Sequence, residues 1–332
     1  MVRIVALEEH VNIPELTSRV PQEAIIARGW PSPDNPVSPI RQVGPQLREI
    51  GAERLQKMDE SGITMQVLSV SGAGADLLDA GKGPALARDC NDALAQKIAT
   101  HPDRFAGFAH LPMTAPEAAA DELERAVTEL RFCGALINGL TQEQFLDHSQ
   151  FAPLLERAEK LGVPLYLHPN IPPESVRKAY YEGLPPALST LLGMAGFGWH
   201  AETAIHVLRL ILSGTFERYP NLSLIIGHMG EMLPVMMARC DNVFKPELTH
   251  LPRTISETLR QQVYITTSGI FTQPPLLAAI ATFGIDRILF SVDYPFSTNA
   301  QGRAFLDGLQ LPAEDLEKIA HKNADKLLKL KA

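Results

Sequence analysis

The chain has 332 residues, of which 45% are apolar and 20% charged, as in an ordinary globular protein. Its formal net charge of -8 and the lack of a basic run argue against a nucleic-acid partner. Cys90, Cys133 and Cys240 are widely spaced, which favours free thiols in a reducing compartment over disulfides or a zinc knuckle. No apolar run is long enough to span a membrane and no basic leader precedes the first strand, so we expect a cytoplasmic protein without a membrane partner.

Short apolar runs alternate with longer helical patterns along the whole chain. The runs predict eight strands, at 4–7, 64–70, 105–110, 134–138, 163–168, 222–228, 263–268 and 287–293. Their continuous apolar character is typical of strands buried on both faces of a parallel sheet. Helical patterns are expected at 51–61, 84–100, 116–131, 151–161, 201–218, 231–244, 275–283 and 312–330.

This alternation predicts an α/β protein, a (β/α)8 barrel of the TIM type, formed as a single domain over residues 1–332. An open doubly wound sheet is the alternative, although no Gly-rich phosphate motif follows the first strand. Two proline-rich insertions, at about 12–50 and 169–200, carry few strand or helix signals. Each follows a strand that ends in reactive side chains, so we expect both to be long lid loops at the C-terminal face.

Reactive side chains stand at the ends of several predicted strands. Glu8 and His10 end the first strand and point to the same side, because alternate residues of a strand share a face. His168, His228 and Asp293 end three others, and in a barrel these ends meet at one mouth. Two carboxylates with imidazoles suit a divalent ion such as Zn²⁺ or Mn²⁺. The alternative to metal binding for each histidine taken singly is a hydrogen-bonded structural role. For Asp293 the alternative is to cap the next helix.

Other polar residues near these strand ends have chemistry that suits a substrate. Glu231, three residues after His228, is placed to bond its imidazole and set its tautomer, or merely to favour a helix N-terminus. Asn138 ends the fourth strand and is able to bond a substrate oxygen. Arg239 is either a ligand for a substrate carboxylate or a surface residue, and His200 lies in the second insertion, within reach of the mouth.

With these residues placed, the chain resembles the amidohydrolase superfamily. It is most similar to the branch of metal-dependent decarboxylases, which includes the γ-resorcylate and aminocarboxymuconate-semialdehyde enzymes. The resemblance covers nearly the whole chain and is carried by the motifs at 6–10, 134–139, 167–169, 226–231, 266–269 and 288–296. The two insertions differ from those of the γ-resorcylate enzymes, and Trp30 is the candidate aromatic residue for packing on a substrate ring.

The resemblance implies a set of metal ligands and a cofactor. Glu8, His10, His168 and Asp293 match the family's positions for holding one divalent ion. No organic cofactor is expected. The resemblance also implies a homodimer or homotetramer.

The resemblance further implies the roles of the residues around the substrate. His228 matches the acid/base histidine and Glu231 its partner, while Asp293 is placed to deliver the proton. Asn138 and Arg239 match substrate-contacting positions, and in some members the arginine comes from a neighbouring subunit.

The expected activity is non-oxidative decarboxylation of a small hydroxy-aromatic or enol-type carboxylic acid. The alternative is a metal-dependent hydrolase that uses the same residues on a lactone, ester or amide. A third alternative, a barrel that binds a ligand without turnover, is disfavoured because every candidate metal ligand is present.

Overall fold

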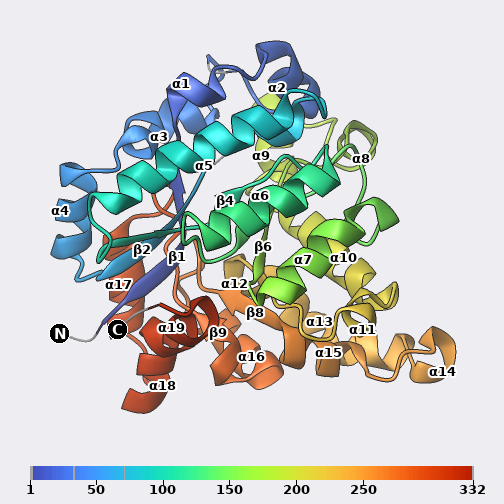
Figure 1. Cartoon of the computed structure of the whole chain (residues 1–332). Helices are drawn as coiled ribbons and strands as arrows, with labels where there is room; N and C mark the ends of the chain where they lie inside the picture. Colours follow the sequence, from blue (N-terminus) through green and yellow to red (C-terminus); the bar gives the residue numbers. More distant parts are fainter. Residues whose placement is uncertain (1–2, 33, 71, 331–332) are drawn as a thin grey trace.

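Parallel strands form the centre of the molecule, and helices surround them (Figure 1). The computed structural model describes residues 3–32, 34–70 and 72–330, so both ends of the predicted domain, 1–2 and 331–332, lie outside the described residues. The strands are β1 (Val5–Val11), β2 (Met65–Val70), β3 (Phe105–Gly107), β4 (Ala109–His110), β5 (Ala135–Asn138), β6 (Leu165–His168), β7 (Leu224–Ile226), β8 (Val263–Thr266) and β9 (Ile288–Leu289).

The strands follow one another in ring order. One sheet has the order β1-β2-β3 and the other runs from β4 to β9. The two sheets join at Phe108, because β3 and β4 are one strand interrupted there, and the Phe108 N–H donates to the Leu68 carbonyl at 2.9 Å. The ring closes where the His10 N–H donates to the carbonyl of Tyr294 at 2.7 Å. All eight predicted strands are present, and the predicted (β/α)8 barrel is confirmed.

The core lies inside this ring and between the ring and its helices. Every residue of β1 and β2 is buried, as expected for strands with both faces covered. The main outer helices are α4 (Ala52–Glu60), α5 (Gly83–Ala99), α6 (Pro116–Thr128), α7 (Ala152–Leu161), α10 (Gly198–Leu212), α13 (Leu233–Val243), α15 (Ile255–Gln262), α16 (Gln273–Phe283), α17 (Asn299–Asp307) and α19 (Asn323–Leu328). Shorter helical elements are α11 (Thr215–Arg218), α12 (His228–Glu231), α14 (Pro246–Thr249), α18 (Ala313–Glu317), η1 (Ala75–Leu77), η2 (Ser149–Phe151), η3 (Ile285–Arg287) and η4 (Lys318–Lys322).

Helix ends follow local sequence signals. α7 ends at Gly162, whose φ of 61° lets its N–H reach the Ala158 carbonyl, so the helix ends where the predicted pattern at 151–161 does. The sequence reading missed α15 and α17, although both begin with a capping box, at Thr254 and Thr298 respectively. Their apolar positions are too few to produce a helical pattern by themselves, so the cap was the available signal.

The two insertions are helical, contrary to the expectation of long loops. The first contains α1 (Pro14–Thr17), α2 (Gln22–Arg28) and α3 (Pro39–Arg48), and the second contains α8 (Glu174–Tyr180) and α9 (Pro186–Gly193). Prolines occupy the first turn of α1, α3 and α9, where a proline starts a helix because no backbone N–H is needed. In Figure 1 these helices lie along the upper side of the barrel. Their action as lids stays a prediction.

The two ends of the described chain meet at the opposite side of the barrel from the insertions (Figure 1). An ion pair of 3.1 Å joins Arg3, just before β1, to Asp325 of α19. Among the described residues, no helix has both the length and the apolar character that crossing a membrane requires.

Candidate metal centre and active site

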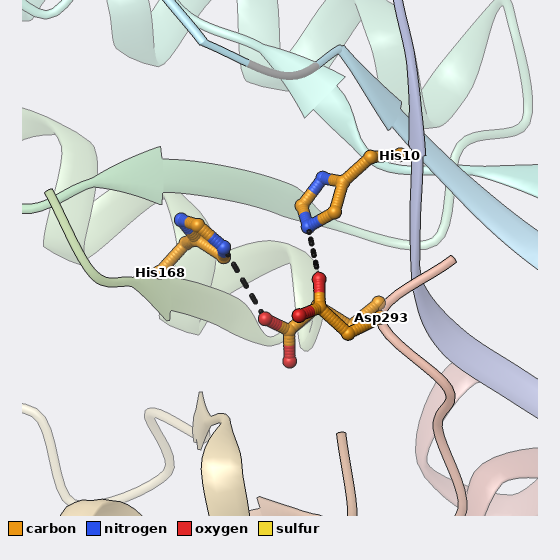
Figure 2. Close-up of side chains that lie close together, drawn as sticks. His10, His168 and Asp293 are labelled. Atoms are coloured by element: carbon orange, nitrogen blue, oxygen red, sulfur yellow. Dashed lines mark ion pairs between the residues drawn. The ribbon is translucent and has the colours of Figure 1, made fainter. Parts of the chain in front are cut away.

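Glu8, His10, His168 and Asp293 come together at the C-terminal ends of the strands. Each offers one ligand atom, and these atoms lie within 4.8 Å of one another. His10 Nε2 lies 3.2 Å from Asp293 Oδ1 (Figure 2). His168 Nε2 lies 3.2 Å from Glu8 Oε1. The structure thus assembles the set of four that the sequence singled out, and its role as a metal site stays a prediction.

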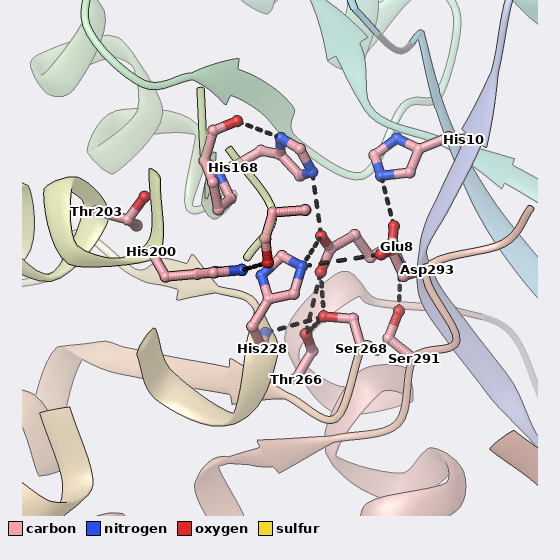
Figure 3. A network of polar contacts seen from close by, with 12 residues as sticks. Glu8, His10, His168, His200, Thr203, His228, Thr266, Ser268, Ser291 and Asp293 are labelled. Atoms are coloured by element: carbon pink, nitrogen blue, oxygen red, sulfur yellow. Dashed lines mark hydrogen bonds and ion pairs between the residues drawn. The ribbon is translucent and has the colours of Figure 1, made fainter. Parts of the chain in front are cut away.

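The two oxygens of the Glu8 carboxylate have different surroundings. Oε2 accepts hydrogen bonds from the hydroxyls of Ser268 and Thr266, the latter at 3.3 Å (Figure 3). It also accepts one from the hydroxyl of Tyr166. Oε1 has no hydrogen-bond donor among the described residues, although Glu8 is fully buried. Three hydroxyls therefore fix one oxygen and leave the other directed at the cluster, an arrangement that suits a metal ligand.

The imidazoles of His168 and His10 also direct a nitrogen at the cluster, as Glu8 directs Oε1. His168 donates from Nδ1 to the Pro169 carbonyl at 2.7 Å, so its Nε2 lone pair faces the cluster. His10 Nε2 is buried and has no hydrogen-bond partner within the described parts of the chain. Together with the free Glu8 oxygen, these nitrogens form a donor set of carboxylates and imidazoles that fits Mn²⁺ or Zn²⁺.

Mutual electrostatics favour the charged forms of Glu8 and His228. Burial by itself would raise the pKa of the Glu8 carboxyl, but the imidazoles of His228, His168 and His10 outweigh it and keep that pKa well below its usual range. Burial would lower the pKa of His228, but Glu8 and Glu231 raise it well above its ordinary value. Glu8 and His228 therefore stabilise each other's charge at the barrel mouth.

A carboxylate shared by two imidazoles stands beside the cluster (Figure 3). His228 Nδ1 donates to Glu231 Oε1 at 2.8 Å, and His200 Nδ1 donates to Glu231 Oε2 at 2.6 Å. The indole N–H of Trp199 donates to His200 Nε2 at 3.0 Å, which is consistent with the proton on Nδ1. The other nitrogen of His228 faces the cluster, 3.6 Å from Glu8 Oε1 and 3.8 Å from Asp293 Oδ2.

The backbone that carries these side chains is strained. His228, Met229, Glu231 and Met232 have φ values of 48° to 65°, a region that residues with a Cβ rarely adopt. Asp293 has a φ of 69°. Such strain persists where the surrounding structure enforces it, and it gathers here on the residues that face the cavity.

Glu9 points away from the cluster and supports it from behind. Its carboxyl accepts hydrogen bonds from the backbone N–H groups of Val292 at 2.9 Å and Tyr294 at 3.3 Å, on either side of Asp293. Burial raises the pKa of Glu9 to about 8, against the lowering effect of the Val292 hydrogen bond and of Arg54. The two adjacent glutamates therefore act on opposite sides of β1, as the alternation of strand side chains predicted.

A cavity of about 1270 Å³ opens above the cluster. His168, His228, Asp293 and Asn138 line it, together with residues of both insertions, including Trp30. The rings of Trp199 and Phe296 also line it, and they lie edge-on to His168 and His10 at 6.4 Å and 5.6 Å between ring centres. The sequence indicated Trp30 as the aromatic candidate for packing on a substrate ring, and it did not single out Trp199 or Phe296 for that role.

Arg239 does not belong to this cavity within its own chain. It lies on the exposed side of α13 and is not among the residues that line the cavity. His110, the remaining strand-end imidazole, is buried and accepts from the Ala75 N–H at 2.9 Å, which is a structural role.

The sequence reading missed the residues that orient others. The roles of Tyr166 and Trp199 depend on partners that are distant in the chain, and no local pattern marks them. For Thr266 and Ser268 the available signal was the hydroxyl run at 266–268, which begins at the last residue of β8.

Residues 13–330 match a family model described as amidohydrolase. The chain belongs to the amidohydrolase family. This amidohydrolase is 38% identical to a gamma-resorcylate decarboxylase of Rhizobium sp. over 338 residues, which cover 98% of each chain.

Solved structures resemble the amidohydrolase over its whole length. One is a 2,6-dihydroxybenzoate decarboxylase complexed with 2,6-dihydroxybenzoate, at 37% identity and a TM-score of 0.88, covering 99% of this chain and 100% of the other. Another is the dihydroxybenzoic acid decarboxylase of Polaromonas sp. with bound manganese and the inhibitor 2-nitroresorcinol. It is 35% identical with a TM-score of 0.86, covering 100% of this chain and 98% of the other. The predicted family is confirmed.

Proposed function

We propose that this amidohydrolase is a metal-dependent decarboxylase that releases CO₂ from a small hydroxy-aromatic carboxylic acid. The observation that carries the proposal is the convergence of Glu8, His10, His168 and Asp293 in one cluster, of which His168 and Asp293 line the cavity together with His228. The 38% identity to a gamma-resorcylate decarboxylase over nearly the full length supports the same reaction.

We assign the metal to the cluster of four. Glu8, His10, His168 and Asp293 would hold a divalent ion, Mn²⁺ or Zn²⁺, and the manganese in the Polaromonas enzyme favours Mn²⁺. When bound, the ion supplies positive charge that neutralises the substrate carboxylate and an adjacent hydroxyl oxygen and orients the group to be lost.

The side chains then provide the proton chemistry. Breaking the bond between the ring and the carboxylate releases CO₂ and leaves its electron pair on the ring carbon, which must take up a proton. Asp293 delivers that proton from its carboxyl group, and His228 Nε2 faces the substrate oxygen. Glu231 holds the proton of His228 on Nδ1, because it accepts that hydrogen bond at 2.8 Å. One proton is consumed for each CO₂ released, and no electron is transferred to or from another molecule.

Neighbouring residues position the ring and exclude water. Asn138 lines the cavity and bonds a polar substituent, while the rings of Trp199 and Phe296 flank the substrate ring. A cavity that excludes water strengthens each charge interaction within it.

We infer a homodimer or homotetramer in which Arg239 of one subunit meets the substrate carboxylate of another. Arg239 shares the exposed side of α13 with Val235 and Met236, which are 73% and 47% exposed. Apolar side chains so exposed along one helix mark an interaction surface. The three free, buried cysteines support the predicted cytoplasmic location.

The test is CO₂ release by the Mn²⁺-loaded enzyme from 2,6-dihydroxybenzoate and a panel of hydroxybenzoates, with lactone hydrolysis scored in parallel. We expect CO₂ release to be lost in His168→Ala and Asp293→Asn and retained in the control His148→Ala, which alters an exposed histidine. Hydrolysis without CO₂ release would overturn the proposal, and so would purified protein that takes up no stoichiometric divalent ion.

A further inference from the structure

The cavity above the metal-centre residues is larger than one aromatic ring requires. Its volume is about 1270 Å³, and it extends from His168, His228 and Asp293 to both insertions. Pockets that enclose a drug-sized ligand measure roughly 300–1,000 Å³. A hydroxybenzoate is a single ring with a carboxylate and a few hydroxyl groups, so it occupies the inner end and leaves the outer part of the chamber unused.

Full charges and apolar side chains are distributed unevenly along this chamber, although uncharged polar side chains of the first insertion, such as Gln22, Ser38 and Gln42, also line it. The inner end carries the cluster of carboxylates and imidazoles, whereas the outer walls are largely apolar. Val20 and Leu47 of the first insertion are 4% and 3% exposed, and Met194 of the second is 4% exposed. Beyond the inner end, the exposed Arg48 is the one residue with a full charge among the described residues that line the chamber. Such walls favour an apolar group over further hydroxyls or a second carboxylate.

We propose that the substrate ring carries an apolar substituent, such as an alkyl chain of several carbons, which lies between the two insertions in the outer chamber. The proposal rests on the proposed decarboxylase function and adds the class of acid that the site prefers. The carboxylate and hydroxyl face the metal-centre residues at the inner end. The alkyl chain displaces water from the apolar walls beyond them, which makes binding more favourable with each buried methylene.

The test compares alkyl chain lengths with the Mn²⁺-loaded enzyme in its native oligomeric state. The substrates are 2-hydroxybenzoates with methyl, propyl, pentyl or heptyl groups at ring carbon 4 or ring carbon 6, with 2,6-dihydroxybenzoate as the reference. We expect kcat/KM to rise along at least one series by about fourfold for each buried methylene, which corresponds to about 0.8 kcal/mol. A flat or falling kcat/KM in both series would overturn the inference.

A second copy of the chain is the competing occupant of the outer chamber. Met232, which caps α13, and Val235, on the exposed side of α13 that we assign to the subunit interface, also line the chamber. If the neighbouring subunit fills the outer chamber, the enzyme shows no preference for longer chains, and that outcome contradicts the proposal.

A matched pair of variants locates the alkyl chain. Ile25 and Ile26 are neighbours on α2, but Ile25 lines the chamber whereas Ile26 does not and is 52% exposed. Ile25→Asp should lower the ratio of kcat/KM for the pentyl acid to that for the methyl acid by roughly tenfold or more, because it places a carboxylate beside the chain. Ile26→Asp should leave that ratio near the wild-type value. Equal ratios in both variants would place the chain elsewhere.

A binding measurement separates this inference from the proposed function. 5-Alkylresorcinols lack the carboxylate, so their affinity, measured by calorimetry, reports on the chamber without turnover. Kd should fall as the alkyl chain lengthens, and a Kd that is independent of chain length would refute the apolar chamber. Absence of CO₂ release from every acid, including 2,6-dihydroxybenzoate, would instead refute the decarboxylase function.

Discussion

Replacing Tyr166 with phenylalanine tests whether the hydroxyls behind Glu8 prepare it to hold a metal. The Tyr166 hydroxyl donates to Glu8 Oε2 and lies 2.9 Å from the hydroxyl oxygen of Thr266. Burial, followed by the charge of Glu8, raises the pKa of Tyr166 well above its ordinary value, so the hydroxyl stays a neutral donor. Tyr166→Phe keeps the ring, which packs against Phe108 at 5.8 Å between ring centres, and removes one hydrogen bond to a buried carboxylate.

A hydrogen bond to a charged group contributes about 1.5–3 kcal/mol, and residues that orient metal ligands change affinity by roughly 10- to 100-fold. We therefore expect the Kd for Mn²⁺ to rise by about 10- to 100-fold in Tyr166→Phe, with little change in circular dichroism. Affinity is measured by titrating metal-free protein with Mn²⁺. Tyr264→Phe is the control, because Tyr264 packs under the Arg287 guanidinium at 4.4 Å and does not belong to the cluster. A Kd for Tyr166→Phe within about threefold of the wild type would refute the proposed role of the hydroxyls.

Three further predictions concern positioning, pH and the backbone. His200→Ala should lower kcat by roughly tenfold or more, because Glu231 Oε2 loses its bond of 2.6 Å, and His200→Asn should restore part of the activity. Burial, assisted by Arg209, lowers the pKa of His206 to about 3, so the unfolded chain binds the proton first as the pH falls below about 6.5. Protonation of the unfolded chain at His206 lowers the free energy of unfolding by about 2 kcal/mol at about pH 5. His206→Gln keeps an acceptor for the Leu146 N–H and should remove that loss, as measured by urea unfolding. Gly134→Ala should destabilise the fold by about 2–3 kcal/mol in the same assay, because its Cβ would overlap the Pro164 carbonyl oxygen at a φ of 149°.

Each of these predictions has an outcome that contradicts it. Equal activities of His200→Ala and His200→Asn would mean that the donor to Glu231 has no positioning role. An unchanged loss of stability between about pH 7.5 and pH 5 in His206→Gln would assign that loss to other groups. Gly183 separates overlap from strain, because its φ is 97° but a Cβ added there would meet no atom of the described residues within 4 Å. If Gly134→Ala and Gly183→Ala cost the same, overlap with Pro164 contributes nothing.

The barrel was predictable because its signals are local and repeated. Each strand is a short apolar run, and the strand ends of a parallel barrel meet at one face regardless of their separation along the chain. The sequence therefore predicts that Glu8, His10, His168 and Asp293 meet at one mouth. The helices of the two insertions were not predicted, because prolines at first-turn positions were interpreted as breaks. The capping boxes at Thr254 and Thr298 are local signals that mark the starts of α15 and α17.

The order of residues along the chain thus determined the fold class and the set of reactive side chains at the mouth. It did not determine how those side chains are oriented. Glu8 is separated from Tyr166 by 158 positions and from Ser268 by 260, and His200 from Glu231 by 31. Hydrogen bonds over such separations leave no periodic pattern, because they depend on the register of strands and helices that pack together only in the folded barrel. The same reason applies to the chamber between the insertions and to Arg239, whose side chain faces out of its own barrel.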